Sequence, residues 1–147
     1  MIMLINQEQK MTPYGDGVGN CLERMVIWLA SNENRSAEGE RMSLEEEIVV
    51  VFSTVPPDRS GSLAKMIVEQ RIVACVNVVP VRSYYIWKGE FCEEQEHLLI
   101  AKTTKDKSGE VIAAIKSQHP YEVPEIVVLP VTHGYPPYLE WVRQETH

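Results

Sequence analysis

Residue types that bind metals or move protons gather in one stretch of this 147-residue chain. Residues 118–134, QHPYEVPEIVVLPVTHG, place two histidines, two glutamates and a tyrosine around a short apolar run. Imidazole and carboxylate groups serve both as metal ligands and as proton carriers. The stretch therefore predicts a metal site, an active site, or only the loops of a small fold. None of the four histidines in the sequence forms an HxxxH or CxxH pair, so spacing alone is weak support for a metal.

The cysteines do not form a recognisable metal or disulfide motif. Cys21, Cys75 and Cys92 are an odd number without a CxxC pair, which fits a reducing cytosol. Cys75 lies in a predicted strand between Ala74 and Val76, so a small buried side chain is the favoured interpretation. The alternative is a ligand or a reactive thiol in a cleft between subunits.

A ligand pocket is a further hypothesis for the second half of the chain. Lys102 is the basic residue best placed to face a cleft, where it would bind an anion or an amine together with Tyr121, Glu122 and Glu125. The alternative, which we favour, is an ion pair between Lys102 and a glutamate of another subunit. Trp87 is either part of a ligand platform or part of a subunit interface, and interface packing is the favoured interpretation.

Catalytic motifs are missing from the sequence. It contains no GxSxG, no HExxH, no glycine-rich phosphate loop and no nucleophile beside a base. We therefore expect a protein that is not an enzyme. An active site assembled from several subunits is the rival hypothesis.

Composition narrows the class of partner. The chain is 44% hydrophobic and 24% charged, as in soluble globular proteins, and carries a formal net charge of −7. An acidic chain without a basic cluster argues against nucleic-acid binding and against attachment to an anionic membrane. Since the apolar runs are too short to span a bilayer, we expect a soluble, cytoplasmic protein.

The chain divides into an extension and a core. Residues 1–46 differ in character from the rest, with a possible helix at residues 20–30 (NCLERMVIWLA) followed by a polar, linker-like segment. From residue 47 onward the hydrophobic pattern becomes regular. We expect the domain to comprise residues 47–147, with residues 1–46 outside its core.

Seven elements are expected in this domain. The predicted strands and helices, in order, are strand 48–54, a helix capped by Asp58 or Ser60 and ending near Arg71, strands 73–87 and 90–104, a helix from Asp106 or Ser108 to His119, strand 126–131 and helix 136–144. Their first six form a βαββαβ order. This order predicts an α+β, ferredoxin-like fold: a four-stranded antiparallel sheet with two helices on one face. Pro80 marks a bulge or an edge strand.

The predicted hairpin is too long for the domain that carries it. Each arm has 15 residues, which extend roughly 50 Å at ~3.3 Å per residue. A 100-residue globule has a radius of gyration of ~13 Å, so its diameter is only ~35 Å. The tip, which includes Tyr84, Tyr85, Trp87 and Phe91, must project and offer open strand edges to another chain. The sequence thus predicts an oligomer held partly by strand pairing between subunits.

Several motifs in series closely resemble the CutA family of divalent-cation-tolerance proteins. They are VVVFSTVP (49–56), VACVN (73–77), SYYIWKGE (83–90), KTT (102–104), HPYEVPEIVVLPVTHG (119–134) and YLEWV (138–142). The resemblance implies a ferredoxin-like fold, a tight trimer in which hairpins pair across subunits, and an architecture like that of PII signalling proteins. It also implies a role in binding copper or other divalent cations, in metal tolerance, or in small-ligand signalling.

The same resemblance implies particular copper ligands. In bacterial CutA proteins the proposed ligands are a cysteine at the end of the first strand and two adjacent histidines before Pro-Tyr. This chain has Ser53 at the first position and Gln118-His119 at the pair. Loss of a thiolate and an imidazole removes the stronger copper donors. We therefore expect only weak copper binding centred on His119, unless symmetry brings several copies of His119 together or Glu122 and Cys75 assist.

Overall fold

A computed structural model describes residues 47–147 of the chain. The expected extension, residues 1–46 with its possible helix at 20–30, lies outside the described residues. None of the helices in residues 47–147 has the length and apolar character needed to cross a bilayer.

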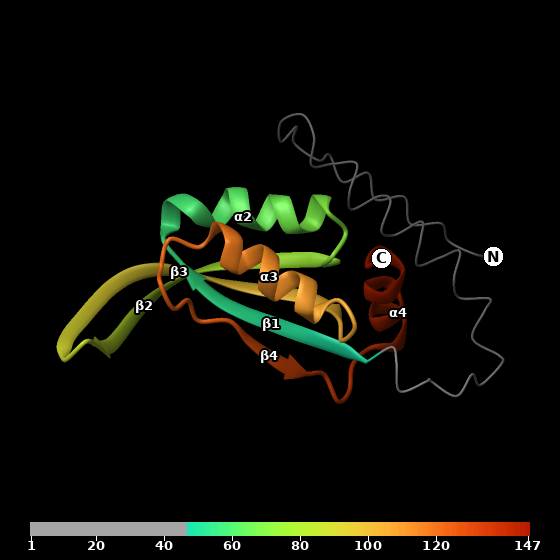
Figure 1. The fold of residues 1–147 in the computed structure, drawn as a ribbon. Helices are drawn as coiled ribbons and strands as arrows, with labels where there is room; N and C mark the ends of the chain where they lie inside the picture. Colours follow the sequence, from blue (N-terminus) through green and yellow to red (C-terminus); the bar gives the residue numbers. More distant parts are fainter. Residues whose placement is uncertain (1–46) are drawn as a thin grey trace, which may run out of the picture. The chain divides into compact units, whose positions relative to one another are not determined.

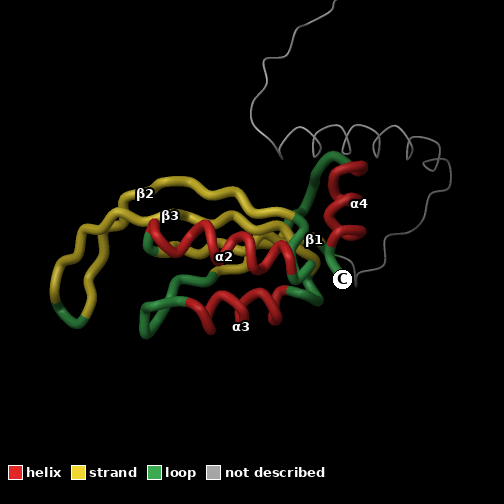
Figure 2. The backbone as a smooth tube through the Cα atoms, turned by 90° about the horizontal axis from the view of Figure 1, so that it is seen from above, coloured by secondary structure: helices red, strands yellow, loops and turns green. Residues whose placement is uncertain are grey.

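The predicted order of elements is confirmed. It runs β1 (Ile48–Val55), α2 (Pro57–Glu69), β2 (Cys75–Trp87), β3 (Glu90–Thr104), α3 (Ser108–Gln118), β4 (Val127–Pro130) and α4 (Pro136–Glu145). The strands form one antiparallel sheet in the order β2-β3-β1-β4. Helices α2 and α3 lie side by side over one face of this sheet (Figures 1 and 2). The fold is therefore α+β and ferredoxin-like, as predicted.

The core lies between the two helices and the sheet. Strand β1 is an inner strand of the sheet and its first five residues are apolar; its alternate residues Val51 and Val55 point into this core. The other core residues come from the helices, β3 and the turn before β2: Leu63, Ile67, Ile72, Val73, Leu99, Ala101, Val111 and Ile115. Burying side chains of this kind stabilises the fold by about 1.5–3 kcal/mol for each large one.

The predicted helix caps are wrong. Helix α2 begins at Pro57, after Pro56, without a side-chain cap. A proline in the first turn is preorganised for a helix and needs no amide partner, which explains the early start. Helix α3 follows Lys107, also without a side-chain cap, and the Ser108 hydroxyl donates instead to the Lys105 backbone oxygen at 2.6 Å.

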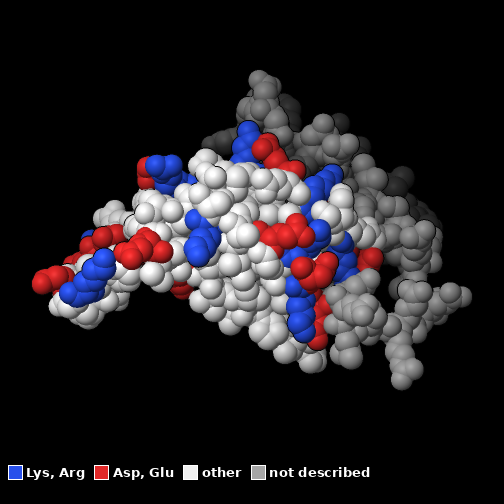
Figure 3. Space-filling model, in the orientation of Figure 1, with Lys and Arg blue, Asp and Glu red and all other residues white. Residues whose placement is uncertain are grey.

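The β2–β3 hairpin projects as expected. Lys88 and Gly89 form its turn, both with positive φ (49° and 88°), the geometry of a type I′ turn. The tip extends well past the ends of the helices (Figures 1 and 2). Basic and acidic side chains lie next to one another on it (Figure 3). Pro80 pairs with His97 without breaking the register, and β2 is an edge strand, so the edge prediction for Pro80 is confirmed.

The final helix closes one end of the sheet. Val142 of α4 packs against Ile48 and Ala74 in a second, smaller core cluster. The turn before α4 packs against Leu139 of that helix, and a Cβ added at Gly134 would lie only 2.9 Å from a methyl carbon of Leu139. The sheet face opposite α2 and α3, here called the open face, still exposes Val79, Val127 and Leu129.

Candidate functional site

A pocket of about 650 Å³ lies where the hairpin leaves the sheet. We call it the hairpin pocket. Its lining comes from the ends of β1 and β2, from β3 and from the loop between α3 and β4: Thr54, Ser83, Tyr84, Tyr85, Trp87, Glu96, Pro120, Tyr121, Glu122, Val123 and Glu125. This volume is typical of small-molecule sites, which range over ~300–1,000 Å³.

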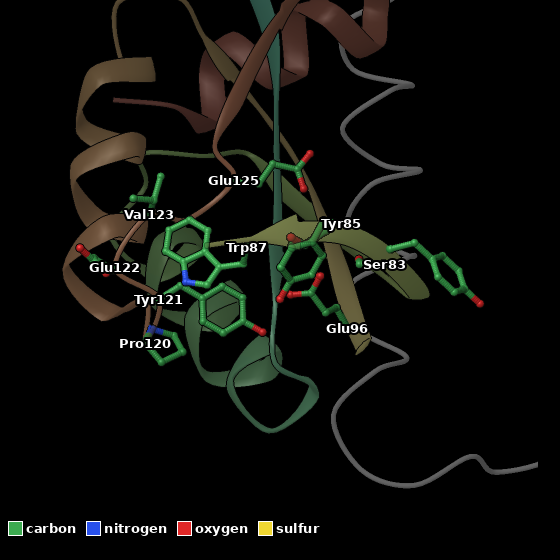
Figure 4. A pocket seen from close by; sticks show the side chains of 11 residues that line it. Ser83, Tyr85, Trp87, Glu96, Pro120, Tyr121, Glu122, Val123 and Glu125 are labelled. Carbon is green, nitrogen blue, oxygen red and sulfur yellow. The ribbon is translucent and has the colours of Figure 1, made fainter. Parts of the chain in front are cut away.

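Strand alternation explains the floor of the hairpin pocket. Ser83, Tyr85 and Trp87 are alternate residues of β2, so their side chains share the open face. Glu96 lies on the same face, because its register partner on β2 is Val81, two residues before Ser83. Figure 4 shows Trp87, Tyr85 and Glu96 among the side chains that converge on the pocket.

The wall of the pocket is the loop that follows α3. Its first residue, His119, is buried and forms a hydrogen bond through Nε2 to the Thr54 backbone oxygen at 2.8 Å. The Tyr121 backbone N–H donates to Nδ1 of the same ring at 3.1 Å. The Tyr121 hydroxyl then donates to a Glu94 carboxylate oxygen at 2.9 Å, which fixes the loop to the hairpin. The first and the third of these contacts hold the wall against β1 and β3, and the second fixes the His119 ring within the loop.

The pocket is acidic and aromatic. Glu96 is only 3% exposed, and its Oε1 has no hydrogen-bond partner among the described residues. Burial raises the pKa of the Tyr121 phenol, as do hydrogen bonding to Glu94 and both the charge and the hydrogen bonding of Glu96. The pKa of Tyr85 is also raised, by desolvation and by Glu94. Both phenols therefore stay neutral beside these carboxylates.

The outer edge of the pocket already binds an ammonium group of the chain itself. The Lys88 Nζ lies 5.4 Å from the centre of the Trp87 ring and 3.2 Å from an Oε2 of Glu122. This arrangement combines a cation–π contact with an ion pair. Lys88 lies outside the lining, which contains no lysine or arginine.

Four of the six residues proposed for a ligand pocket lie together. Trp87, Tyr121, Glu122 and Glu125 all line the hairpin pocket. Cys75 and Lys102 do not line it; they are register partners at the other end of the β2–β3 pairing. The grouping of Lys102 with Tyr121, Glu122 and Glu125 in one pocket is thus absent from the described structure.

Cys75 and Lys102 have other neighbours. The Cys75 Sγ lies 3.6 Å from the Tyr138 hydroxyl, and burial, followed by this contact, raises the pKa of Tyr138. The Lys102 Nζ donates to the Asn77 side-chain oxygen and to the Ile100 backbone oxygen. Cys75 and Cys92 are free thiols.

The positions implied for copper do not form a metal centre in this conformation. Since Nδ1 of His119 accepts the Tyr121 N–H, the ring proton is on Nε2 and is donated to Thr54, so neither nitrogen has a free lone pair. Ser53 is fully buried and Gln118 is exposed at the end of α3. Within residues 47–147, no group of three or more His, Cys, Asp or Glu side chains is arranged to hold a metal ion.

Sequence reasoning missed Glu96, Ser83 and Thr54 as pocket residues, and placed Tyr85 only at the hairpin tip. The signal for Glu96 was present, because a two-residue turn at Lys88-Gly89 fixes the register and alternation places Glu96 on the open face. The burial of Glu96 could not be predicted from the sequence, because it depends on how the loop after α3 folds over the hairpin.

The comparisons with known proteins agree with this architecture. The family model described as CutA1 divalent ion tolerance protein matches residues 48–145. The chain is 46% identical to the divalent-cation tolerance protein CutA of Thermus thermophilus over 103 residues, which cover 69% of this chain and 98% of that protein. It is 40% identical to the chloroplastic Protein CutA of Arabidopsis thaliana over 149 aligned positions, covering 97% of this chain and 81% of that protein.

A solved structure shares the fold as well. The PII-like protein CutA from Nostoc sp. PCC 7120, in apo form, superimposes with a TM-score of 0.65 at 39% identity, and the match covers 67% of this chain and 97% of that one. The family model spans the whole of the described domain apart from its end residues. This chain therefore belongs to the CutA family of divalent-ion-tolerance proteins.

Proposed function

We propose that this protein is a non-enzymatic CutA protein that binds a small ligand in the hairpin pocket as part of a response to divalent cations. One observation carries the proposal: a pocket of about 650 Å³ contains a buried carboxylate, Glu96, whose Oε1 lacks a partner within the described residues. Leaving such a group unpaired costs about 1–3 kcal/mol or more, and a ligand that donates a hydrogen bond to it removes this cost. An unpaired group facing a ligand-sized cavity supports a binding function.

One contact among the described residues bears on the non-enzymatic part of the proposal. The nearest approach to a nucleophile and base is Ser60, whose Oγ lies 2.7 Å from His97 Nδ1. The same Oγ is within hydrogen-bond distance of the Pro57 backbone oxygen, at 2.9 Å, and when the hydroxyl donates there, His97 Nδ1 is the donor to Ser60 and not its base. A serine held in this way is not activated for attack.

The proposal gives copper a minor role. His119 shares both ring nitrogens with backbone groups, so a metal must break one of these hydrogen bonds before it can bind there. We propose that His119 binds copper only weakly. The response to divalent cations that we propose for this protein does not require a preformed copper centre.

We further propose that the protein is a homotrimer assembled through its hairpins. Strand β2 is a free edge, and the hairpin exposes Ile86 (65%) and Phe91 (67%), which is unfavourable in water. The open sheet face adds Val79, Val127 and Leu129. Pairing of hairpins between three copies covers these groups. The free thiols of Cys75 and Cys92 favour a reducing compartment, and we propose the cytoplasm.

A thermal-shift screen of metals, nucleotides and metabolites tests the proposal. A ligand that binds only the native protein raises its melting temperature by mass action. Stabilisation by a compound that is recovered unchanged supports a binding protein, whereas a stabilising compound that is turned over identifies an enzyme.

A further inference from the structure

The buried carboxylate of Glu96 selects the charge of the ligand. Its surroundings in the pocket are the phenols of Tyr85 and Tyr121 and the indole of Trp87 (Figure 4). The Tyr121 hydroxyl donates to Glu94 and also lies close to Glu96, but Glu96 Oε1 has no hydrogen-bond partner among the described residues. With no lysine or arginine in the lining, the described chain supplies no positive charge to offset Glu96.

A bare metal ion fits this pocket poorly. Divalent cations require several ligand atoms at one point, and the described residues contain no group of three or more His, Cys, Asp or Glu side chains that could hold one. Glu122 and Glu125 are exposed at the edge of the pocket, while Glu96 is buried. The carboxylates are therefore spread along the pocket, as suits an extended molecule.

An ammonium group on an apolar body meets each of these requirements. Its N–H groups can donate to Glu96, and its positive charge can lie against the faces of the aromatic rings. Its apolar body can fill the rest of the cavity, because about half of the lining residues are aromatic or aliphatic. Lys88 shows the same recognition at the edge, where its ammonium lies over Trp87 and pairs with Glu122. Resting on the ligand-binding function proposed above, we infer that the hairpin pocket binds a small organic ammonium compound, with Glu96 as its charged partner.

The experiment uses the full-length protein and three probes of one size: benzylammonium, benzyl alcohol and benzoate. We expect calorimetry and thermal shift to show binding of benzylammonium only, in the millimolar range or tighter, as befits a fragment. The Glu96→Gln variant should weaken this binding by about tenfold or more, because a charge-assisted hydrogen bond becomes a neutral one. The matched control is Glu69→Gln, an exposed carboxylate of α2 paired with Lys65, which should leave binding unchanged.

Stability without ligand gives a second readout. If no cation is bound at Glu96 in the ligand-free protein, Glu96→Gln removes a buried charge that has no counter-charge and should raise the melting temperature of the oligomer. If a lysine of a neighbouring copy already occupies the pocket, the same variant breaks a buried ion pair and should lower that temperature, which overturns the inference.

The probe series separates this inference from the proposed function. Equal binding of benzyl alcohol or benzoate, or no binding of benzylammonium, overturns the choice of an ammonium ligand. The function proposed above is tested independently, by the wider screen and by blocking the pocket.

Discussion

The His119 ring and the Thr54 backbone are joined by a hydrogen bond of 2.8 Å that fixes the loop after α3 to the end of β1. The second ring nitrogen accepts the N–H of Tyr121, which positions one wall of the hairpin pocket. The histidine that the family resemblance marks as a copper ligand thus has a structural role in this chain.

Copper binding should be weak for this reason. We expect calorimetry on the metal-free protein to give a dissociation constant no tighter than micromolar, because the metal must displace a hydrogen bond and finds no cluster of donors in the described residues. His119→Ala should remove this binding, with exposed Gln118→Ala as the control. Submicromolar copper affinity that survives His119→Ala would place the metal site elsewhere.

Ser53 should tolerate loss of its hydroxyl. Its side chain is fully buried, and its Oγ has no hydrogen-bond partner among the described residues. Removing an unpaired buried polar atom relieves its desolvation cost, so Ser53→Ala should raise the free energy of unfolding by up to about 1 kcal/mol. Denaturant unfolding measures this, with exposed Ser62→Ala as the control. A loss of stability larger than about 1 kcal/mol would show that the hydroxyl forms a hydrogen bond within the folded domain.

Much of the architecture was predictable from local rules. The element order follows from the apolar run of β1, from the end of α3 just before His119-Pro120, and from the Lys88-Gly89 turn, which also fixes the hairpin register. The helix starts were not predicted, because Pro57 begins α2 without a polar cap. For the site, strand alternation places Trp87 on the open face, but no local rule shows that Tyr121 reaches Glu94 across 27 residues of sequence. That contact depends on tertiary packing of a loop.

Trp87 should matter for the assembly more than for the single domain. It remains 40% exposed in the described chain, so its remaining surface is available to a partner or a ligand. Trp87→Ala should weaken the proposed trimer by about 3–5 kcal/mol if the partner buries the ring fully. Analytical ultracentrifugation measures the shift toward monomer, with exposed Tyr135→Ala as the control. A wild-type protein that sediments as a stable monomer at micromolar concentration rules out the trimer.

Stability should fall in alkaline solution through Tyr121. Burial and the hydrogen bond to Glu94 raise the pKa of this phenol above its unfolded value of ~10. Below that value the phenol is protonated in both the folded and the unfolded protein, so it does not reduce the free energy of unfolding. Above it the unfolded chain loses a proton that the folded chain retains, so the free energy of unfolding declines as pH rises. Between about pH 8 and about pH 11, the melting temperature should therefore fall less steeply with pH for Tyr121→Phe than for wild type. Identical slopes, with Tyr135→Phe as the reference, would contradict this role of Tyr121.

The central claim is that the hairpin pocket is the ligand site, and blocking it tests this claim most directly. Val123 is an exposed lining residue on the loop after α3, so Val123→Trp adds a large side chain at the pocket without disturbing the core. The matched control is Val68→Trp, at an exposed position of α2 that does not line the pocket. We predict that compounds which raise the melting temperature of the wild type and of Val68→Trp lose this effect on Val123→Trp. Equal stabilisation of all three proteins by every such compound would contradict the claim.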